Sequence, residues 1–254
     1  MQLTRPQRGF TLTELAVVFA IVALLIASAM STLSSQVERR DNEETQRRLS
    51  TAADAVIAFA IVNRRLPCPA AGATGDESLA TGTTATGGAC TSNFGGLLPA
   101  RSLGLQPVDA AGFAIDAWGN RLRYAVASAI TGCTGSSTTP HFTSVANLKA
   151  NGVSCQPNDL DICAPTDTTT ACTAANRVVS TSTVAVIIFS TGKDGALPAA
   201  SQGPHELANI DGNASFISHP QAASDANTGR YDDLMVWIPA GVVYSKMIAA
   251  GVLP

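Results

Sequence analysis

The chain has 254 residues, of which 46% are hydrophobic, 14% are charged and 5% are aromatic, and its formal net charge is −3. This length and apolar content are enough to bury a core, which excludes a wholly disordered chain. A mildly acidic chain with 16 lysines and arginines has no broad basic surface, so we expect no nucleic-acid partner.

An uncharged apolar run dominates the first thirty residues. From Leu15 to Met30 the chain contains no charged residue, no proline and no glycine. With the uncharged residues just before it, the run reaches about 20 residues, enough at ~1.5 Å per helical residue to cross a ~30 Å hydrocarbon layer. Three interpretations compete: a cleaved secretory signal, a buried core helix and a retained membrane anchor.

Two features argue against a cleaved secretory signal, although Ala27-Ser28-Ala29 loosely fits its cleavage site. Glu14 lies inside the apolar stretch, where an ionised carboxylate costs about 2.5–3.5 kcal/mol at the bilayer centre and less near its edge. Arg5 and Arg8 precede the run so closely that the polar leader covers only residues 1–9. A carboxylate in such surroundings needs a positively charged partner.

The segment Arg8-Gly9-Phe10-Thr11-Leu12-Thr13-Glu14-Leu15 resembles the type IV prepilin signature, in which a basic leader is followed by Gly-Phe and by an acid four residues after the Phe. The resemblance implies that a prepilin peptidase cleaves between Gly9 and Phe10 and methylates the new N-terminus. It also implies that Glu14 pairs with the N-terminus of a neighbouring subunit and sets the register of assembly. A Glu14 side chain that only reaches the membrane surface is the alternative.

After the apolar run the pattern stays helical and becomes amphipathic. Between Ser31 and Arg65 apolar residues recur at spacings of three and four, as a helix with one buried face requires. Two prolines then follow in 66–69 and cannot continue a helix. We therefore expect a leader at 1–9, a transmembrane and assembly helix at 10–30, its amphipathic continuation at 31–65 and a globular periplasmic domain at 66–254.

The region 66–254 is predicted to contain three strands and one short helix. Alternating apolar residues predict a strand at 122–126, and a run of β-branched residues predicts a buried strand at 183–190. A third strand is expected at 234–238. A short helix is expected at 242–250, where Gly251 stops it.

Two segments of this region resemble major type II secretion pseudopilins. The first comprises Leu98-Pro99, Asp116-Ala117-Trp118-Gly119-Asn120 and Arg123-Tyr124. The second, Phe189-Ser190-Thr191-Gly192-Lys193-Asp194-Gly195 with Asp232-Asp233-Leu234 and Trp237, resembles their C-terminal calcium loop, although a long stretch separates its two parts. The resemblance implies that Asp194, Asp232 and Asp233 bind Ca²⁺; ordinary turn-forming roles are the alternative. Residues 131–176 and 205–227 have no counterpart in this comparison.

The cysteines predict disulfides. None of the six lies in a C-x-x-C pair, and no histidine has zinc-ligand spacing from them. An even number in loop-rich segments is typical of an oxidising compartment, and the pairing stays open, with sequential pairs preferred and free buried thiols as the alternative. The six are Cys68, Cys90, Cys133, Cys155, Cys163 and Cys172.

The sequence gives no sign of catalysis. It contains no G-x-S-x-G, H-E-x-x-H, P-loop or G-x-G-x-x-G motif, and the neighbouring His205 and Glu206 are expected to be surface groups. We therefore expect that the protein is not an enzyme.

Together these patterns predict an α+β, pilin-like fold, with a long N-terminal helix packed on a small antiparallel sheet with disulfide-bearing loops. The resemblance implies a structural subunit of a type II secretion pseudopilus or a type IV pilus. Before assembly it would cross the inner membrane once, with a periplasmic C-terminal domain, and then enter the filament.

The partners implied are a prepilin peptidase, other pilin or pseudopilin subunits and an inner-membrane assembly platform. The platform's ATPase must supply the energy, because the chain has no nucleotide-binding motif. One alternative is a minor subunit or tip adhesin that binds a surface or DNA. The other is a membrane-tethered periplasmic binding protein or enzyme that does not form the filament body.

Overall fold

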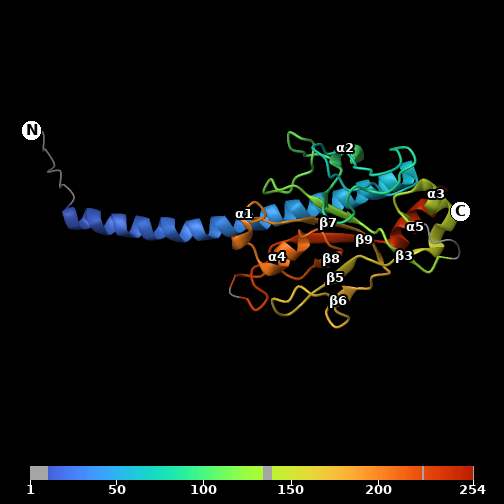
Figure 1. Ribbon diagram of the computed structural model, residues 1–254. Coiled ribbons are helices and arrows are strands. Elements are labelled where there is room, and N and C mark those ends of the chain that lie inside the picture. Colours follow the sequence, from blue (N-terminus) through green and yellow to red (C-terminus); the bar gives the residue numbers. More distant parts are fainter. Residues whose placement is uncertain (1–10, 134–138, 225, 254) are drawn as a thin grey trace, which may run out of the picture. The chain divides into compact units, whose positions relative to one another are not determined.

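The computed structural model describes residues 11–133, 139–224 and 226–253, without the side chains of residues 27–34. The chain divides into two compact units, Met1–Glu43 and Glu44–Pro254. Figure 1 shows the helices and strands and labels most of them with the names used below.

The described residues form five α-helices and two 3₁₀ turns. They are α1 (Leu12–Asn63), α2 (Ala100–Leu103), α3 (Val145–Asn151), η1 (Gly152–Ser154), η2 (Ala199–Ser201), α4 (Pro204–Asn209) and α5 (Ala240–Ala249). The strands are β1 (Gly96–Leu97), β2 (Arg123–Val126), β3 (Ile130–Thr131), β4 (Gln156–Pro157), β5 (Asp161–Cys163), β6 (Arg177–Val179), β7 (Val184–Ser190), β8 (Ser215–Ile217) and β9 (Leu234–Pro239).

Helix α1 runs for 52 residues without a break. No proline or glycine occurs within it, so nothing in its sequence interrupts the backbone hydrogen bonds. It ends at Asn63, two residues before the predicted end at Arg65, because Arg64 takes a left-handed backbone conformation with φ 59°.

The main sheet has four antiparallel strands in the order β1-β2-β7-β9. Its central strand β7 is buried at every residue, as its run of valine and isoleucine predicted. Tyr124 of β2 and Val236 of β9 both pair with Ile188 of β7, which fixes the register across the three strands. The three predicted strands and the C-terminal helix are thus confirmed.

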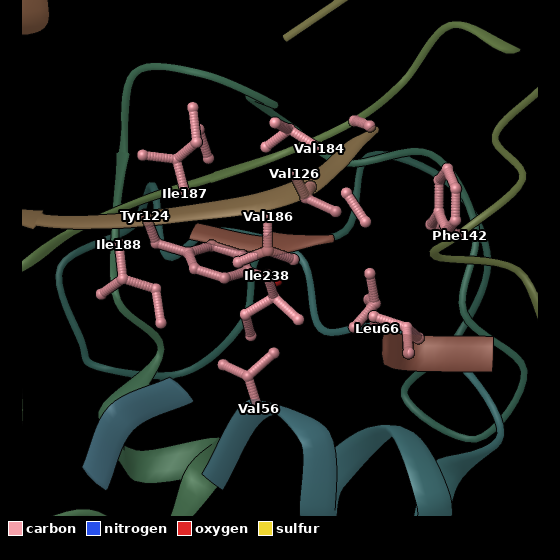
Figure 2. Packing of buried hydrophobic residues seen from close by; sticks show 14 of the residues in the cluster. Val56, Leu66, Tyr124, Val126, Phe142, Val184, Val186, Ile187, Ile188 and Ile238 are labelled. Carbon is pink, nitrogen blue, oxygen red and sulfur yellow. The ribbon is translucent and has the colours of Figure 1, made fainter. Parts of the chain in front are cut away.

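The second half of α1 supplies one wall of the core. Leu49, Ala52, Val56 and Ala60 recur at spacings of three and four and are all buried. Figure 2 shows Val56 pointing from the helix toward Ile238 and the other apolar side chains of the sheet. The predicted α+β fold, with a helix packed on an antiparallel sheet, is therefore confirmed.

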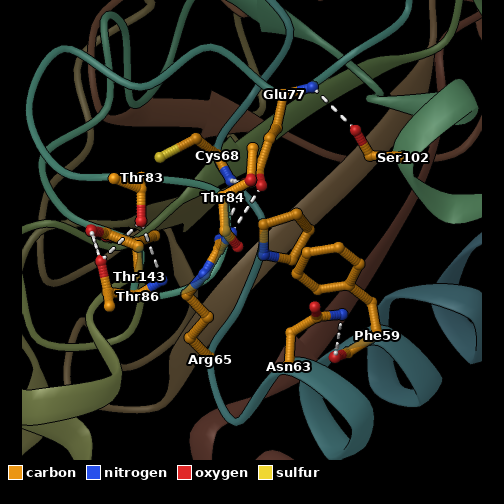
Figure 3. A network of polar contacts seen from close by, with 12 residues as sticks. Phe59, Asn63, Arg65, Cys68, Glu77, Thr83, Thr84, Thr86, Ser102 and Thr143 are labelled. Atoms are coloured by element: carbon orange, nitrogen blue, oxygen red, sulfur yellow. Dashed lines mark hydrogen bonds and ion pairs between the residues drawn. The ribbon is translucent and has the colours of Figure 1, made fainter.

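A buried ion pair fixes the chain just after α1. Arg65 donates to both carboxylate oxygens of Glu77, at 2.8 and 2.5 Å, and to the carbonyl of Thr84 at 2.6 Å. Glu77 also accepts a hydrogen bond from the backbone N–H of Cys68. Both side chains are buried, so this network joins the helix end to the following loop (Figure 3).

A second small sheet comes from regions where no strand was predicted. Strand β5 pairs antiparallel with β6 and parallel with β8, and β3 pairs separately with β4. Helix α4 begins one residue before the stretch 205–227, and strand β8 lies within it. This stretch therefore contains regular secondary structure. It places α4 beside the loop that follows β7.

All six cysteines form disulfides. They are paired Cys68–Cys90, Cys133–Cys155 and Cys163–Cys172. These are the sequential pairs that were preferred from the spacing of the cysteines along the chain.

Candidate functional site

The N-terminal signature falls partly within the described residues. Gly9 and Phe10, the predicted cleavage and methylation positions, lie outside them. Helix α1 begins at Leu12, and the Thr11 hydroxyl accepts a hydrogen bond of 3.2 Å from the backbone N–H of Glu14. Thr11 is therefore the N-cap, and Glu14 occupies the third helical position, where helices favour an acid.

The Glu14 side chain is exposed, and it makes no hydrogen bond or ion pair with the part of the chain that the structure describes. It lies in the first turn of α1, where the positive end of the helix dipole stabilises a negative charge. This carboxylate can therefore form an ion pair with a positively charged group from outside the described residues.

The first turns of α1 expose large apolar side chains. At Phe19 the exposed fraction is 64% and at Leu24 it is 72%. The set consists of Leu12, Leu15, Val17, Val18, Phe19, Ile21, Val22, Leu24, Leu25 and Ile26. A continuous exposed apolar surface of this kind marks a contact with protein or lipid. Among the described residues, no helix contains a stretch that is both long enough and apolar enough to cross a membrane.

A group of acids forms a second candidate site, in the unit Glu44–Pro254. Asp194 lies in the loop after β7, Glu206 in the first turn of α4, and Asp232 just before β9. One carboxylate oxygen from each lies within 4.8 Å of the others. Asp194 and Glu206 are each only 2% exposed.

The turn at 116–120 holds the loop that carries Asp194. Asp116 Oδ1 accepts hydrogen bonds from the N–H groups of Trp118 and Asn120, and its Oδ2 accepts one from the Ser190 hydroxyl. The Asn120 side-chain amide donates to the carbonyl of Gly192 at 2.6 Å. These hydrogen bonds from the turn therefore fix the position of the loop at the point where it follows β7.

Gly192 is required at this point of the loop. Its φ is 64°, and a Cβ atom there would lie 2.1 Å from Asp232 Oδ1. Only glycine combines this backbone conformation with such a close approach.

Hydrogen bonds bring the acids together. Glu206 accepts one from the N–H of Gly203 and another from the N–H of Asp232, while the Asp194 N–H donates to Asp232 Oδ2. Arg230 forms an ion pair with Asp194. It brings one positive charge to a group of three carboxylates.

Burial and mutual repulsion change the acidity of the group. Burial, followed by the neighbouring Asp194 and Glu206, raises the pKa of Asp232 to about 8. Burial likewise raises the pKa of Glu206. Additional positive charge would therefore stabilise the ionised form of the cluster.

The donor set fits a hard divalent cation. Asp194 Oδ1 and Asp232 Oδ1 are buried and accept no hydrogen bond from the described residues. All three side chains offer oxygen atoms, which Ca²⁺ prefers over nitrogen or sulfur. Asp194, Glu206 and Asp232 could therefore hold such a cation, with backbone carbonyls and water completing its coordination.

The structure brings together two of the three predicted calcium ligands. Asp233 lies outside the group, because successive side chains of an extended chain point in opposite directions. Its carboxylate accepts a hydrogen bond of 2.7 Å from Asn209, and burial raises its pKa. In its place Glu206 joins Asp194 and Asp232.

The expectation that His205 and Glu206 are surface groups is wrong, since both are buried. His205 Nε2 donates to the Thr169 carbonyl, and His205 Nδ1 lies 2.9 Å from His219 Nε2. A sequence signal for Glu206 existed: Gly203-Pro204 followed by an acid is typical of a helix start with the acid in its first turn.

Comparison with known proteins supports the N-terminal signature. The family model of the prokaryotic N-terminal methylation motif matches residues 4–30. No curated protein and no solved structure matches the chain. The chain therefore carries a type IV pilin-like prepilin signature, and the match covers the basic leader, Gly9, Phe10, Glu14 and the apolar run that follows.

Proposed function

We propose that this protein is a structural subunit of a type II secretion pseudopilus or a type IV pilus. The observation that carries the proposal is that the methylation motif at 4–30 includes the start of an uninterrupted helix, α1, whose first turns expose apolar side chains. In this proposal a prepilin peptidase cleaves between Gly9 and Phe10 and methylates the new amine, and α1 then packs against other subunits.

Glu14 is proposed to set the register of assembly. Cleavage at Gly9 would leave a positive amine at Phe10, four residues before the Glu14 carboxylate. In apolar surroundings the free energy of an unpaired carboxylate is high, so an amine from a neighbouring subunit is the partner that lowers it. The absence of a Glu14 side-chain partner within the described chain supports this role.

The proposed location follows from the same helix. Before assembly the protein would lie in the inner membrane with its disulfide-bonded domain in the periplasm, an oxidising compartment that suits its three disulfides. On assembly, contacts between apolar helices would replace contacts with lipid. The assembly platform and its ATPase would supply the energy, and the subunit itself would have no enzymatic role.

Ca²⁺ is proposed to bind at Asp194, Glu206 and Asp232. The cation would supply the positive charge that this buried group lacks and would join the loop after β7 to α4 and to the start of β9. It would therefore stabilise this part of the domain.

Mass spectrometry of the mature N-terminus and a filament assay test the assembly role. We expect a methylated phenylalanine at position 10 in the wild type. Glu14→Ala should be processed and inserted in the membrane but should not enter filaments, whereas Glu43→Ala, which removes an exposed acid from the same helix, should assemble normally. A chain that starts at Met1, or normal filament incorporation of Glu14→Ala, would contradict the proposal.

Calorimetric titration of the full chain in detergent with CaCl₂ tests the cation site. We expect a Kd of about 1 mM or tighter, the range of extracellular calcium modules, together with a rise in Tm. Asp194→Asn should abolish both effects, and Asp76→Asn, at a half-exposed acid outside the cluster, should keep them. Absence of binding and of a Tm shift in the wild type would exclude the site.

A further inference from the structure

The turn between α4 and β8 contains an exposed asparagine in a modification motif. Residues Asp211-Gly212-Asn213-Ala214-Ser215 include the pattern Asn-x-Ser, in which the middle residue is not proline. This pattern is the acceptor sequence for N-linked oligosaccharides, and it is expected on surface loops of exported proteins. None of the other asparagines of the chain is followed by Ser or Thr at the second position.

The fold presents this asparagine to solvent. Asp211, Gly212 and Asn213 are all exposed, and Gly212 has a φ of 83° that turns the chain outward before β8 begins. The Ser215 hydroxyl, which a transferase must recognise, makes no hydrogen bond with the described part of the chain. The disulfides independently indicate export to an oxidising compartment, where such transfer takes place.

Local hydrogen bonds orient the acceptor amide. Asn213 Oδ1 accepts from the N–H of Ser215 at 2.6 Å, and Asn213 Nδ2 donates to Asp211 Oδ2 at 2.5 Å. The Asn213 backbone N–H donates to Asp211 Oδ1 at 2.8 Å. Asp211 therefore fixes the amide and places a negative charge beside it, at the surface where a cationic group of a transferase could bind.

From this placement we propose that Asn213 is an acceptor for N-linked oligosaccharide. The donor is an oligosaccharide linked through diphosphate to a polyprenol. Asn213 Nδ2 attacks the anomeric carbon of the first sugar and loses one proton to the solvent. The new C–N bond forms as the C–O bond to the diphosphate breaks, and polyprenyl diphosphate leaves with the electron pair.

The position of the turn limits what the sugar would disturb. The Ala214 carbonyl accepts a hydrogen bond from the N–H of Asp161, and Ser215 is in register with Asp161, so the sheet begins immediately after the acceptor. Asn213 itself takes no part in that ladder. A sugar there would project from the turn without breaking a strand hydrogen bond.

The test uses the folded full chain, a bacterial oligosaccharyltransferase and a polyprenyl-diphosphate oligosaccharide, with intact-mass and peptide-mass measurement. We expect one added oligosaccharide, located on the peptide that contains Asn213. Asn213→Gln and Ser215→Ala should lose it, and Ser215→Thr should keep it. Asn227→Gln, which changes another exposed asparagine outside the motif, should also keep it.

The contribution of Asp211 to oligosaccharide transfer is measured from the initial transfer rate. Asp211→Asn should lower the initial transfer rate by about tenfold, the loss of one charged contact, while Tm stays unchanged. A synthetic peptide with the sequence of residues 209–217 shows that the enzyme and donor are active. If that peptide is modified and the folded chain is not, or if Asn213→Gln is still modified, the proposal is overturned.

Discussion

Two stretches of α1 carry apolar side chains in different surroundings. Between residues 12 and 26 these side chains are exposed, whereas Leu49, Ala52, Val56 and Ala60 are buried in the core. Burial within the chain stabilises the fold only in the second stretch. The apolar surface of the first stretch can be removed from water only by a partner outside the described chain. One helix thus stabilises the fold in one part and, in the proposed function, mediates association in the other, and mutations can separate the two properties.

The largest effect is expected at the buried ion pair that follows the core stretch. Arg65→Ala removes the guanidinium and leaves the Glu77 carboxylate buried without its positive partner, which should lower the free energy of unfolding by about 3–5 kcal/mol. The double variant Arg65→Met, Glu77→Leu should recover most of this loss, because no buried charge remains. Urea unfolding measures both, and an Arg65→Ala loss below ~1 kcal/mol would contradict the expectation.

A matched pair of leucines tests the comparison directly. Leu49 is fully buried, whereas the exposed fraction of Leu15 is 51%. Leu49→Ala should lower the free energy of unfolding by about 2–5 kcal/mol, and Leu15→Ala should change it by less than ~0.5 kcal/mol. Leu15→Ala should instead reduce filament yield. If Leu49→Ala and Leu15→Ala lower the free energy of unfolding equally, the exposed stretch contributes to the stability of the fold as much as the buried one, which contradicts the comparison.

A pH dependence of stability is expected from His141, in the unit Glu44–Pro254. Burial lowers the pKa of His141 to about 4, below its ordinary value near 6.5. The unfolded chain therefore binds more protons than the folded one between these values, and stability falls as the pH falls from 6.5 toward 4. The loss attributable to His141 is at most ~3 kcal/mol.

Urea unfolding of the wild type and of His141→Gln at pH 7.5, 6 and 5 measures this contribution. The variant should show a smaller fall in stability over the same interval. Identical pH profiles would contradict the assignment to His141.

The smallest effect is expected at the end of the helix. Arg64 adopts a φ of 59°, a conformation that glycine takes at lower free energy than arginine. Arg64→Gly should therefore raise the free energy of unfolding by about 0.5–1 kcal/mol. Thermal unfolding of the two proteins at one pH is sufficient, and a lower Tm in the variant would show that the arginine side chain stabilises the fold.

The elements that the sequence predicted are those with a strong local pattern. Helix α1 combines an uninterrupted apolar run with an amphipathic continuation, and β7 is a run of β-branched and apolar residues, so each is recognisable without its neighbours. Helix α4 and strand β8 have 6 and 3 residues, too few to show a period. Their positions depend on contacts between segments far apart in the chain.

The candidate cation site likewise contains residues that a local motif predicted and one that depends on contacts between distant segments. Asp194 and Asp232 were predicted from a motif, whereas Glu206 was missed because only the folded chain places α4 beside the loop after β7. Asp233 was predicted as a ligand from the same motif, but the structure does not place it in the group. Adjacent residues in an extended segment face opposite sides, and Asp233 binds Asn209 instead.

The order of the disulfides has a consequence for how the domain matures. In chain order the first cysteine is bonded to the second, the third to the fourth and the fifth to the sixth, with separations of 22, 22 and 9 residues, and no loop encloses or crosses another. In the proposed topology the domain crosses the membrane after its anchor, so its cysteines arrive in chain order and every thiol meets its native partner before the first cysteine of the following pair arrives. Oxidation in the order of emergence yields the correct bonds, and reshuffling by an isomerase is not required.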